Sequence, residues 1–443
     1  MRKTVHRQLP LVPALREHSH VAELEEMGRI LDGNPEIAEA AHADLVRGVR
    51  ADTGCEGLSA DQVVRAAILY HQNGWSYAEL AFQLAYHAAY RGFCRLDIDQ
   101  YPSRSSLQRD IKRIEPQTWE KINRILIRYA KEAGIEDGKK ARTDCTVTET
   151  TMHYPTDADL LWDCVRRLTL ELEHANDIVD VSYADHRKRA KRRLFAINNA
   201  KKMSQRIGPY RDLLKVTKKT LGYAKRTVGA LKRSKHIFAS EHLVTLQEYI
   251  ELTARVIDQT ERRILLGESV PAAEKVVSIF EPHTDVICKG GRETLYGHKL
   301  CLTAGVANLI TDCVVLEGNP PDTTLAVEMM KRHIEIFDRP PEQAAFDGGF
   351  ASRDNLDDLK ELGIEEVAFS KRRELEVLDM VKSSWVYKRL REFRAGIEGI
   401  ISFLKRVFGL NRCRWKGRRS FKAYAWSSIV SANLLVLARH ALE

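Results

Sequence analysis

The sequence predicts a mixed α/β protein with two all-helical additions, and three observations support this fold class. Residues 1 to about 135 contain repeated helix-start signals and no strand pattern. β-branched residues follow Asp144, and further strand patterns return only after about residue 275. The chain has 443 residues, which is more than one ordinary domain contains, so we expect two or three domains.

The composition is that of a globular protein with a moderate excess of positive charge. Apolar residues make up 44% of the chain, and the net charge is +9, from 70 basic and 61 acidic residues. The eight cysteines show no C-x-x-C pair and no zinc spacing, so we expect reduced cytosolic thiols. No apolar leader follows Met1. The most apolar tract, from Ala423 to Leu442, carries several polar residues and favours a buried helix over a membrane span.

Residues 1–135 are predicted to form a helical domain. Three capping boxes mark helix starts, at Ser59…Gln62, Ser76…Glu79 and Ser105…Gln108. Helices over 60–71 and 77–86, joined by a tight turn, would form a helix-turn-helix-like pair. Arg104 and Arg109 lie near the start of the next helix, a place that suits DNA phosphate contact. The alternative is a plain helical bundle with a solvated basic face.

Residues 156–274 are predicted to be a basic helical insertion. Between residues 187 and 235 there are 18 Lys and Arg but a single acid, Asp212. Charge runs are usually solvated helix faces, but so large an excess would repel itself without a polyanion. We therefore expect contact with nucleic-acid phosphates. The densest run contains Arg187, Lys188, Arg189, Lys191, Arg192 and Arg193.

After the insertion, strand and helix patterns alternate. Strands are expected over 276–280, 295–306, 310–316, 344–347 and 365–369, and helices over 323–337, 353–362 and 385–407. With the strand after Asp144 placed first and the insertion set aside, this is the order of an RNase H-like mixed sheet flanked by helices. In such a domain, acids stand on the first strand, at the end of the fourth and on the helix after the fifth.

Three acids occupy those places: Asp144, Asp347 and Glu398. Asp347 ends an apolar strand at a glycine turn, a common position for chemistry in α/β proteins. Each acid also has an ordinary explanation. Asp144 could cap a turn or pair with Arg142, and Glu398 could form an i,i+4 pair with Arg394 on a surface helix. Glu149 and Asp157 are rivals for the first position, although Asp157 is better explained as a helix cap.

The helix around Glu398 carries a charged line, Arg394-x3-Glu398-x6-Lys405, on one face. With this line, the chain resembles insertion-sequence transposases of the DDE class, whose third-acid helix bears this signature. The block from Asp144 to Leu161 resembles the family's first-acid block, and Phe346–Ser352 resembles its second. Tyr296-Gly297-His298-Lys299 resembles the family's Y-G-x-K strand. Two features depart from the family: Arg391 replaces a frequent tyrosine, and the large insertion follows the first strand instead of the fifth.

The resemblance implies a catalytic site and its chemistry. Asp144, Asp347 and Glu398 would hold Mg²⁺ or Mn²⁺, as two ions. Arg394 and Lys405 would contact DNA or orient Glu398, with Lys299 and His298 as weaker candidates for contact. Water would free a 3′-hydroxyl at the element end, and that hydroxyl would attack target DNA. The alternatives are a DNA-binding regulator with silent acids and a metal-dependent nuclease without strand transfer.

The resemblance also implies a domain plan and partners. Residues 1–135 would bind DNA, 136–155 with 275–443 would form the catalytic domain, and 156–274 would be the insertion. The partners would be double-stranded DNA, both element ends and target, and a second copy of the chain in a dimer or higher assembly. No membrane is expected, and the location would be the bacterial cytoplasm, at the nucleoid when bound to DNA.

Overall fold

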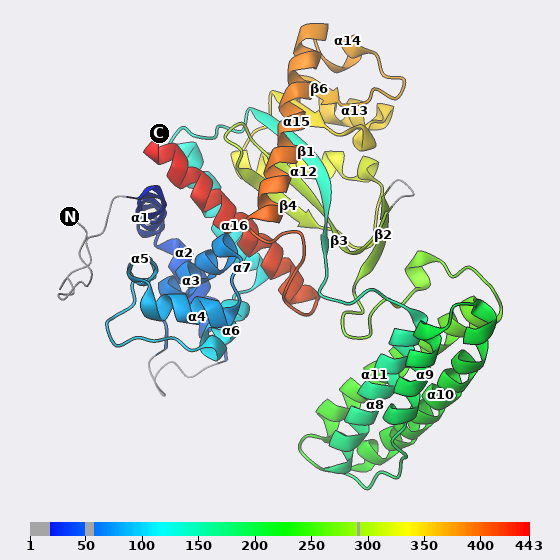
Figure 1. The fold of residues 1–443 in the computed structure, drawn as a ribbon. Helices are drawn as coiled ribbons and strands as arrows, with labels where there is room; N and C mark the ends of the chain where they lie inside the picture. Colours follow the sequence, from blue (N-terminus) through cyan, green and yellow to red (C-terminus); the bar gives the residue numbers. More distant parts are fainter. Residues whose placement is uncertain (1–17, 49–56, 290–292) are drawn as a thin grey trace, which may run out of the picture.

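The chain folds around one mixed β-sheet flanked and extended by helices (Figure 1). A computed structural model describes residues 18–48, 57–289 and 293–443. The strands of the sheet are β1 (Lys140–Glu149), β2 (Asp285–Lys289), β3 (Glu293–Ala304), β4 (Ile310–Val315), β5 (Gln343–Phe346) and β6 (Glu366–Phe369). β1 is central, antiparallel to β3 and parallel to β5, and β6 continues in parallel beyond β5. β2 and β4 both pair with β3. This order is consistent with the expected RNase H-like α/β fold.

Successive buried residues of β3 point into different hydrophobic cores, so both faces of the sheet are packed. Leu300 and Leu302 belong to one hydrophobic core, while Cys301 between them belongs to another. The second core contains the buried rings of Phe346 and Phe369. The helices around the sheet are α12 (Ala326–Phe337), α13 (Arg353–Glu361), α14 (Val377–Met380) and α15 (Ser384–Arg406). Ser383 is the N-cap residue of α15, and the helix packs along β1, β5 and β6.

The N-terminal helices do not form a core of their own. They are α1 (Ser19–Asp32), α2 (Glu36–Leu45), α3 (Ala60–Asn73), α4 (Tyr77–Tyr86), α5 (Ala88–Phe93), α6 (Arg104–Arg113) and α7 (Pro116–Glu132). The final helix, α16 (Arg418–Leu442), packs against α1, α3 and α7 (Figure 1). Trp119 of α7, Leu434 of α16 and Leu302 of β3 lie in one continuous hydrophobic core. The helices at both ends of the described chain and one face of the sheet are therefore one packed body.

The helix boundaries in this region follow the predicted capping residues, with one correction. Ser59 and Gln62 form a reciprocal capping box at the start of α3, and Ser76 caps α4. The third predicted box is wrong, because α6 is capped by Ser103, which accepts from the backbone N–H of Ser106. Ser103, two residues earlier, uses the same hydroxyl chemistry that the sequence assigned to Ser105.

Among the described residues, α16 is the one helix long and apolar enough to cross a membrane. However, 89% of its apolar stretch is buried inside the protein. Its polar residues are satisfied there: Asn433 bonds to Asn123 and to the backbone of Ile310. The predicted buried helix is thus confirmed, and it forms the axis on which the N-terminal helices pack.

The insertion is a helical bundle with a separate core, at the lower right of Figure 1. Its helices are α8 (Asp157–Asn176), α9 (Arg187–Asn199), α10 (Met203–Arg233) and α11 (Ala239–Thr260). The chain enters the insertion near Asp157 and leaves it near Arg263, and these two residues form an ion pair in which Arg263 donates to Asp157 at 2.8 Å. The segment 276–280 that follows is irregular, so the strand predicted there is wrong, and the strand of this region is β2, at 285–289.

Candidate active site

Strand register brings two of the three predicted acids side by side. Asp144 lies within β1, opposite Leu302 of β3. Asp347 directly follows β5, whose last residue, Phe346, is in register with Thr143 of β1. Each aspartate therefore stands one residue beyond a paired position on neighbouring parallel strands. Parallel strands release their carboxyl ends at the same edge, which places the two carboxylates together.

Arg394 of α15 joins all three acids. One guanidinium nitrogen, Nη2, lies 2.8 Å from Asp144 and 3.0 Å from Asp347. The other, Nη1, lies 2.9 Å from Glu398, one turn further along α15. The Arg394 side chain is only 13% exposed, whereas Glu398 is 66% exposed. The Arg394–Glu398 pair is therefore part of a partly buried cluster and not an ordinary pair on a surface helix.

The two aspartates respond differently to this environment. Burial raises the pKa of Asp144 above its ordinary value, although Arg394 and the Cys145 N–H act against that rise. Burial also acts to raise the pKa of Asp347. There, Arg394 and hydrogen bonds from Gly348, Ser370 and Gly349 prevail and hold the pKa below its ordinary value. Asp347 is thus a stabilised carboxylate, while ionised Asp144 is costly to bury.

The donor chemistry fits hard divalent cations. Three carboxylates and one guanidinium leave a formal charge of −2 (three minus one) in the cluster. Oxygen ligands of this kind suit Mg²⁺ or Mn²⁺. The acids are arranged around the guanidinium, and its Nε is buried without a hydrogen-bond partner among the described residues. Glu398 is exposed enough to turn towards a shared ion without repacking the core.

Sequence reasoning missed three neighbours of this cluster. Ser370, the residue after β6, donates to Asp347 at 3.0 Å, and the strand-end rule that singled out Asp347 could have found it. Asp322 lies close enough to raise the pKa of Asp144 and is held by Lys299 at 2.5 Å. Lys371 follows Ser370 beside the glycine turn. No sequence signal marked Asp322, which lies in the crossover between β4 and α12.

The glycine turn after Asp347 makes room for side chains. A Cβ on Gly349 would lie 2.5 Å from an Asp322 carboxylate oxygen, and one on Gly348 would lie 2.7 Å from the Lys371 side chain. Neither position could hold a larger residue without displacing these neighbours. The two glycines therefore allow Asp322 and Lys371 to lie close to the turn that follows Asp347.

The other acids considered for the first position, and the arginine considered as a partner of Asp144, make contacts outside the cluster. Arg142 does not pair with Asp144: it donates to the Phe393 carbonyl at 2.8 Å and to Asn308 at 2.5 Å. Glu149 pairs with Arg412 at 2.9 Å at the end of β1. Asp157 holds Arg263 at the base of the insertion, and Thr156, not Asp157, caps α8. Of the candidates for the first position, only Asp144 contacts Arg394 within the described structure.

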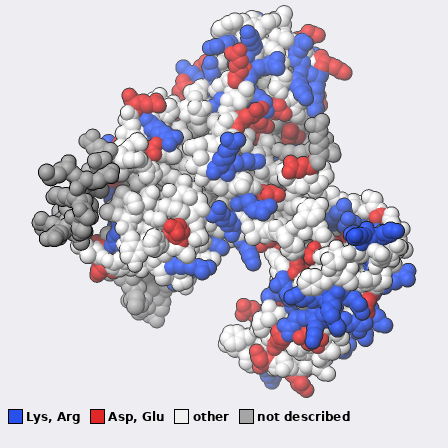
Figure 2. Space-filling model, viewed as in Figure 1, with Lys and Arg blue, Asp and Glu red and all other residues white. Residues whose placement is uncertain are grey.

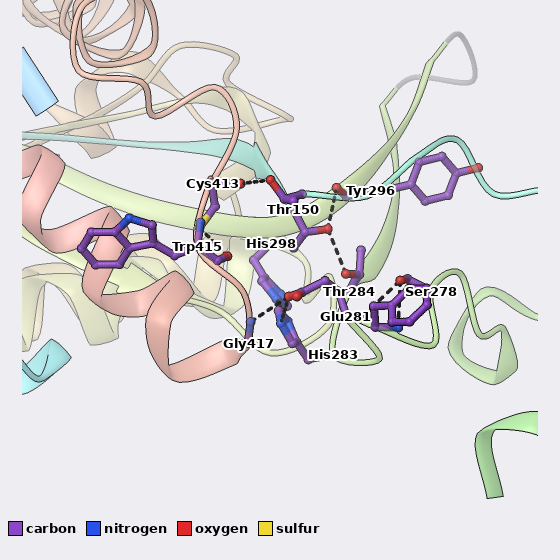
Figure 3. A network of polar contacts seen from close by, with 12 residues as sticks. Thr150, Ser278, Glu281, His283, Thr284, Tyr296, His298, Cys413, Trp415 and Gly417 are labelled. Atoms are coloured by element: carbon purple, nitrogen blue, oxygen red, sulfur yellow. Dashed lines mark hydrogen bonds and ion pairs between the residues drawn. The ribbon is translucent and has the colours of Figure 1, made fainter. Parts of the chain in front are cut away.

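His298 occupies a buried network and not a DNA-facing surface, which corrects its assignment as a contact candidate. Its Nδ1 lies 2.7 Å from Asp285, and its Nε2 lies 2.7 Å from His283. His283 in turn reaches Glu281 at 2.9 Å, and Glu281 accepts from the Gly417 N–H at the start of α16 (Figure 3). This network anchors the segment returning from the insertion to β3 and α16. Lys299, the next residue, points to Asp322 instead.

The predicted DNA-contact residues differ in solvent exposure and in whether an acidic side chain already pairs with them. Arg104 is exposed at the start of α6, while the exposed Arg109 pairs with Asp110 at 2.8 Å. Lys405 is half-buried on the face of α15 that carries Glu398. In α9, Arg187 binds Glu173 and Asp185, and Arg189 and Arg193 both bind Asp212. Within the described structure, Lys188, Lys191 and Arg192 are exposed without an acidic partner.

A longer basic stripe, within the basic segment 187–235 but outside its densest run, runs along α10. Cations recur at helical spacing on its exposed side, and Figure 2 shows Lys and Arg gathered over the insertion. The stripe consists of Arg211, Lys215, Lys218, Lys219, Lys225, Arg226, Lys232 and Arg233. Of these, Lys218 pairs with Glu261 at 2.6 Å. Most of the free positive charge of the insertion therefore lies on α10 and not on the densest sequence run.

The sheet order and the converging carboxylates are consistent with an RNase H-like α/β domain, and a comparison with known protein families points in the same direction. Residues 274–434 match the family model described as "Transposase DDE domain". This match supports a transposase of the DDE class, a class that acts on DNA and generally uses divalent metal ions. No curated protein and no solved structure matches the chain. The matched segment contains Asp347 and Glu398, and Asp144 lies upstream of it.

Proposed function

We propose that this protein cleaves the ends of an insertion sequence and joins the freed 3′-hydroxyl to target DNA. The observation that carries the proposal is the convergence of Asp144, Asp347 and Glu398 on Arg394, from positions up to 254 residues apart (398 minus 144). Such a separation is bridged only by the fold. Two of the three acids, Asp347 and Glu398, lie in the segment that matches a transposase DDE domain, where a cluster of acids with net negative charge is the expected place for the chemistry.

The three acids would hold two Mg²⁺ or Mn²⁺ ions. Such ions activate a water or hydroxyl on one side of a phosphodiester and stabilise the leaving oxygen on the other. Asp347, already a stabilised carboxylate, would be the firmest ligand. Asp144 would gain most from added positive charge, because burial disfavours its ionised form. Arg394, relieved of neutralising three acids, would turn to a DNA phosphate near the site.

Basic residues outside the three-acid cluster would bind the DNA. The α10 stripe and the free cations of α9 would follow the phosphate backbone, and Arg104 at the start of α6 would add a contact from the N-terminal helices. Two element ends must be held at once for joining, which favours a dimer or higher assembly on DNA. We place this activity in the bacterial cytoplasm.

The catalytic proposal is tested with Asp347→Asn and Glu398→Gln. Each should reduce Mg²⁺-dependent cleavage of element-end DNA by at least about a hundredfold, since a metal ion's contribution of several kcal/mol spans at least two powers of ten. Glu149→Gln, an acid outside the cluster, serves as the matched control and should keep activity. Far-ultraviolet circular dichroism establishes that each variant is folded.

The products distinguish the proposal from its alternatives. Cleavage followed by covalent joining to target DNA supports a transposase. Cleavage with no joined product would indicate a metal-dependent nuclease. Specific DNA binding without any Mg²⁺- or Mn²⁺-dependent cleavage would indicate a regulator whose acids are silent.

A further inference from the structure

The helical insertion contains a second cluster of metal-binding side chains, remote from the three acids. Glu171 and His174 lie near the end of α8, and His242 lies near the start of α11. One ligand atom from each of the three lies within 4.8 Å of the other two. Among the residues that the structure describes, this is the one group of three or more such side chains with that spacing.

Helix geometry explains why these residues meet. Glu171 and His174 are three residues apart, so they share one face of α8. α11 packs alongside α8 and brings His242 to that face. The rings of His174 and His242 lie edge to face with centroids 5.9 Å apart. Glu171 is only 3% exposed, while His174 is exposed and His242 half-buried, so the cluster has a buried base and an open mouth.

The buried carboxylate is held in place from within. Arg167, one turn earlier on α8, lies 2.5 Å from Oε1 of Glu171. Arg167 itself lies over the ring of Tyr249 on α11, 4.7 Å from its centroid. An arginine that fixes one carboxylate oxygen orients the group, as outer-shell partners do around metal ligands, and a carboxylate has a second oxygen for an ion.

The geometry points to a site for a transition-metal ion of the Zn²⁺ type, formed by Glu171, His174 and His242. Two imidazoles and one carboxylate form the ligand set of zinc sites that have three protein ligands and a fourth position open to water. Imidazole ligands favour Zn²⁺, Ni²⁺ or Co²⁺ over Mg²⁺, so this site would differ in metal class from the three-acid cluster. A bound ion would tie α8 to α11 at the end of the bundle away from Asp157. The inference does not depend on the proposed transposition activity.

The test uses the full chain, without a histidine tag and freed of metal. Isothermal titration with Zn²⁺ in millimolar Mg²⁺, which occupies the three-acid cluster, should show one further site, and Co²⁺ should give the visible absorption of a site with nitrogen ligands. His242→Ala should weaken Zn²⁺ binding by at least about a hundredfold, because it removes one of three ligands. His236→Ala, which removes an exposed histidine six residues earlier, is the matched control and should bind as the unchanged protein does.

Two further measurements keep the inference open to refutation. Zn²⁺ should raise the melting temperature of the unchanged protein and of His236→Ala but not of His242→Ala, and millimolar Mg²⁺ should not displace it. If His242→Ala folds poorly, the same Zn²⁺ binding and melting measurements are made on Glu171→Gln, which alters another ligand of the same site. The inference fails if the unchanged protein binds no Zn²⁺ at micromolar concentration, or if His242→Ala binds it equally well.

Discussion

At the scale of single residues, the two aspartates of the cluster contribute to stability in opposite directions. Asp144 has a raised pKa, so its stabilising contribution is complete only at low pH and is lost as pH rises through its folded-state pKa. Asp347 has a lowered pKa, so its contribution is present at neutral pH and is lost as pH falls through its folded-state pKa. At pH 7 without metal, ionised Asp144 therefore weakens the fold that ionised Asp347 supports.

This asymmetry gives a prediction that is independent of catalysis. Without metal at pH 7, Asp144→Asn should melt higher than the unchanged protein, and Asp347→Asn should melt lower. Each shift should be roughly 1–3 °C, because 1 kcal/mol moves the melting temperature of a large chain by only about 2 °C. Differential scanning calorimetry at pH 7 and pH 4 checks this, and the advantage of Asp144→Asn should shrink at pH 4. Equal lowering by both variants at pH 7 would contradict it.

Residue identities in the cluster were only partly accessible from the sequence. The acids and Arg394 could be proposed because strand ends and helical spacing are local patterns. Ser370 also follows a strand end and could have been proposed by the same rule, whereas Asp322 could not be joined to them, because its proximity depends on how the β4–α12 crossover meets the end of β5. His298 was misjudged for a related reason: the sequence does not show that Asp285 and His283 enclose it.

At the scale of elements, the insertion separates its charged residues into two kinds. Three arginines of α9 are bound by acids of the bundle itself, whereas most cations of the α10 stripe have no acidic partner in the described chain. Charge density along the sequence indicated the first group, because sequence alone does not show that Glu173, Asp185 and Asp212 neutralise it. Element positions were predicted better than charge roles: α3, α4, β4 and α15 lie within a few residues of their expected ranges.

The α10 stripe provides a prediction about DNA affinity. The double variant Lys225→Ala/Lys232→Ala should weaken duplex binding across sequences and reduce the slope of log affinity against log salt by up to about 1.8, at about 0.9 per phosphate contact. Lys121→Ala/Lys331→Ala changes net charge equally at exposed positions outside the insertion. Fluorescence anisotropy at several salt concentrations should separate the two. Identical slopes would remove the stripe from the DNA-binding surface.

At the scale of the whole molecule, the N-terminal helices and α16 are joined by a buried polar contact as well as by the shared core. His71 of α3 is completely buried between the hydroxyls of Ser427 at 2.7 Å and Ser428 at 3.0 Å. Burial lowers its pKa to about 3. The histidine is therefore neutral in the folded protein, and its protonation on unfolding favours the unfolded state below about pH 6.5.

Acid should therefore weaken the joined body. The His71 contribution is complete above about pH 6.5 and declines as pH falls towards its folded-state pKa, so unfolding should cost about 2 kcal/mol less at pH 5 than at pH 7.5 from this residue alone. His71→Gln should flatten that part of the pH dependence, while His236→Gln, at an exposed site, should not. Chemical denaturation at a series of pH values measures the slope. An unchanged slope in His71→Gln would exclude His71 as a source of acid sensitivity.

The ion pair between Asp157 and Arg263, at the two ends of the insertion, has a consequence for how the chain folds. β1 and β3 must pair although 147 residues lie between the facing residues Glu149 and Gly297 (297 minus 149, minus one). Closing an unstructured loop of that length carries an entropic cost that grows with the logarithm of its length, about 0.6 kcal/mol for each doubling. A bundle that forms first, with its own core and its two ends clamped together, converts the long loop into a short one. The insertion can thus act as a folding nucleus that makes the central pairing of the sheet nearly local.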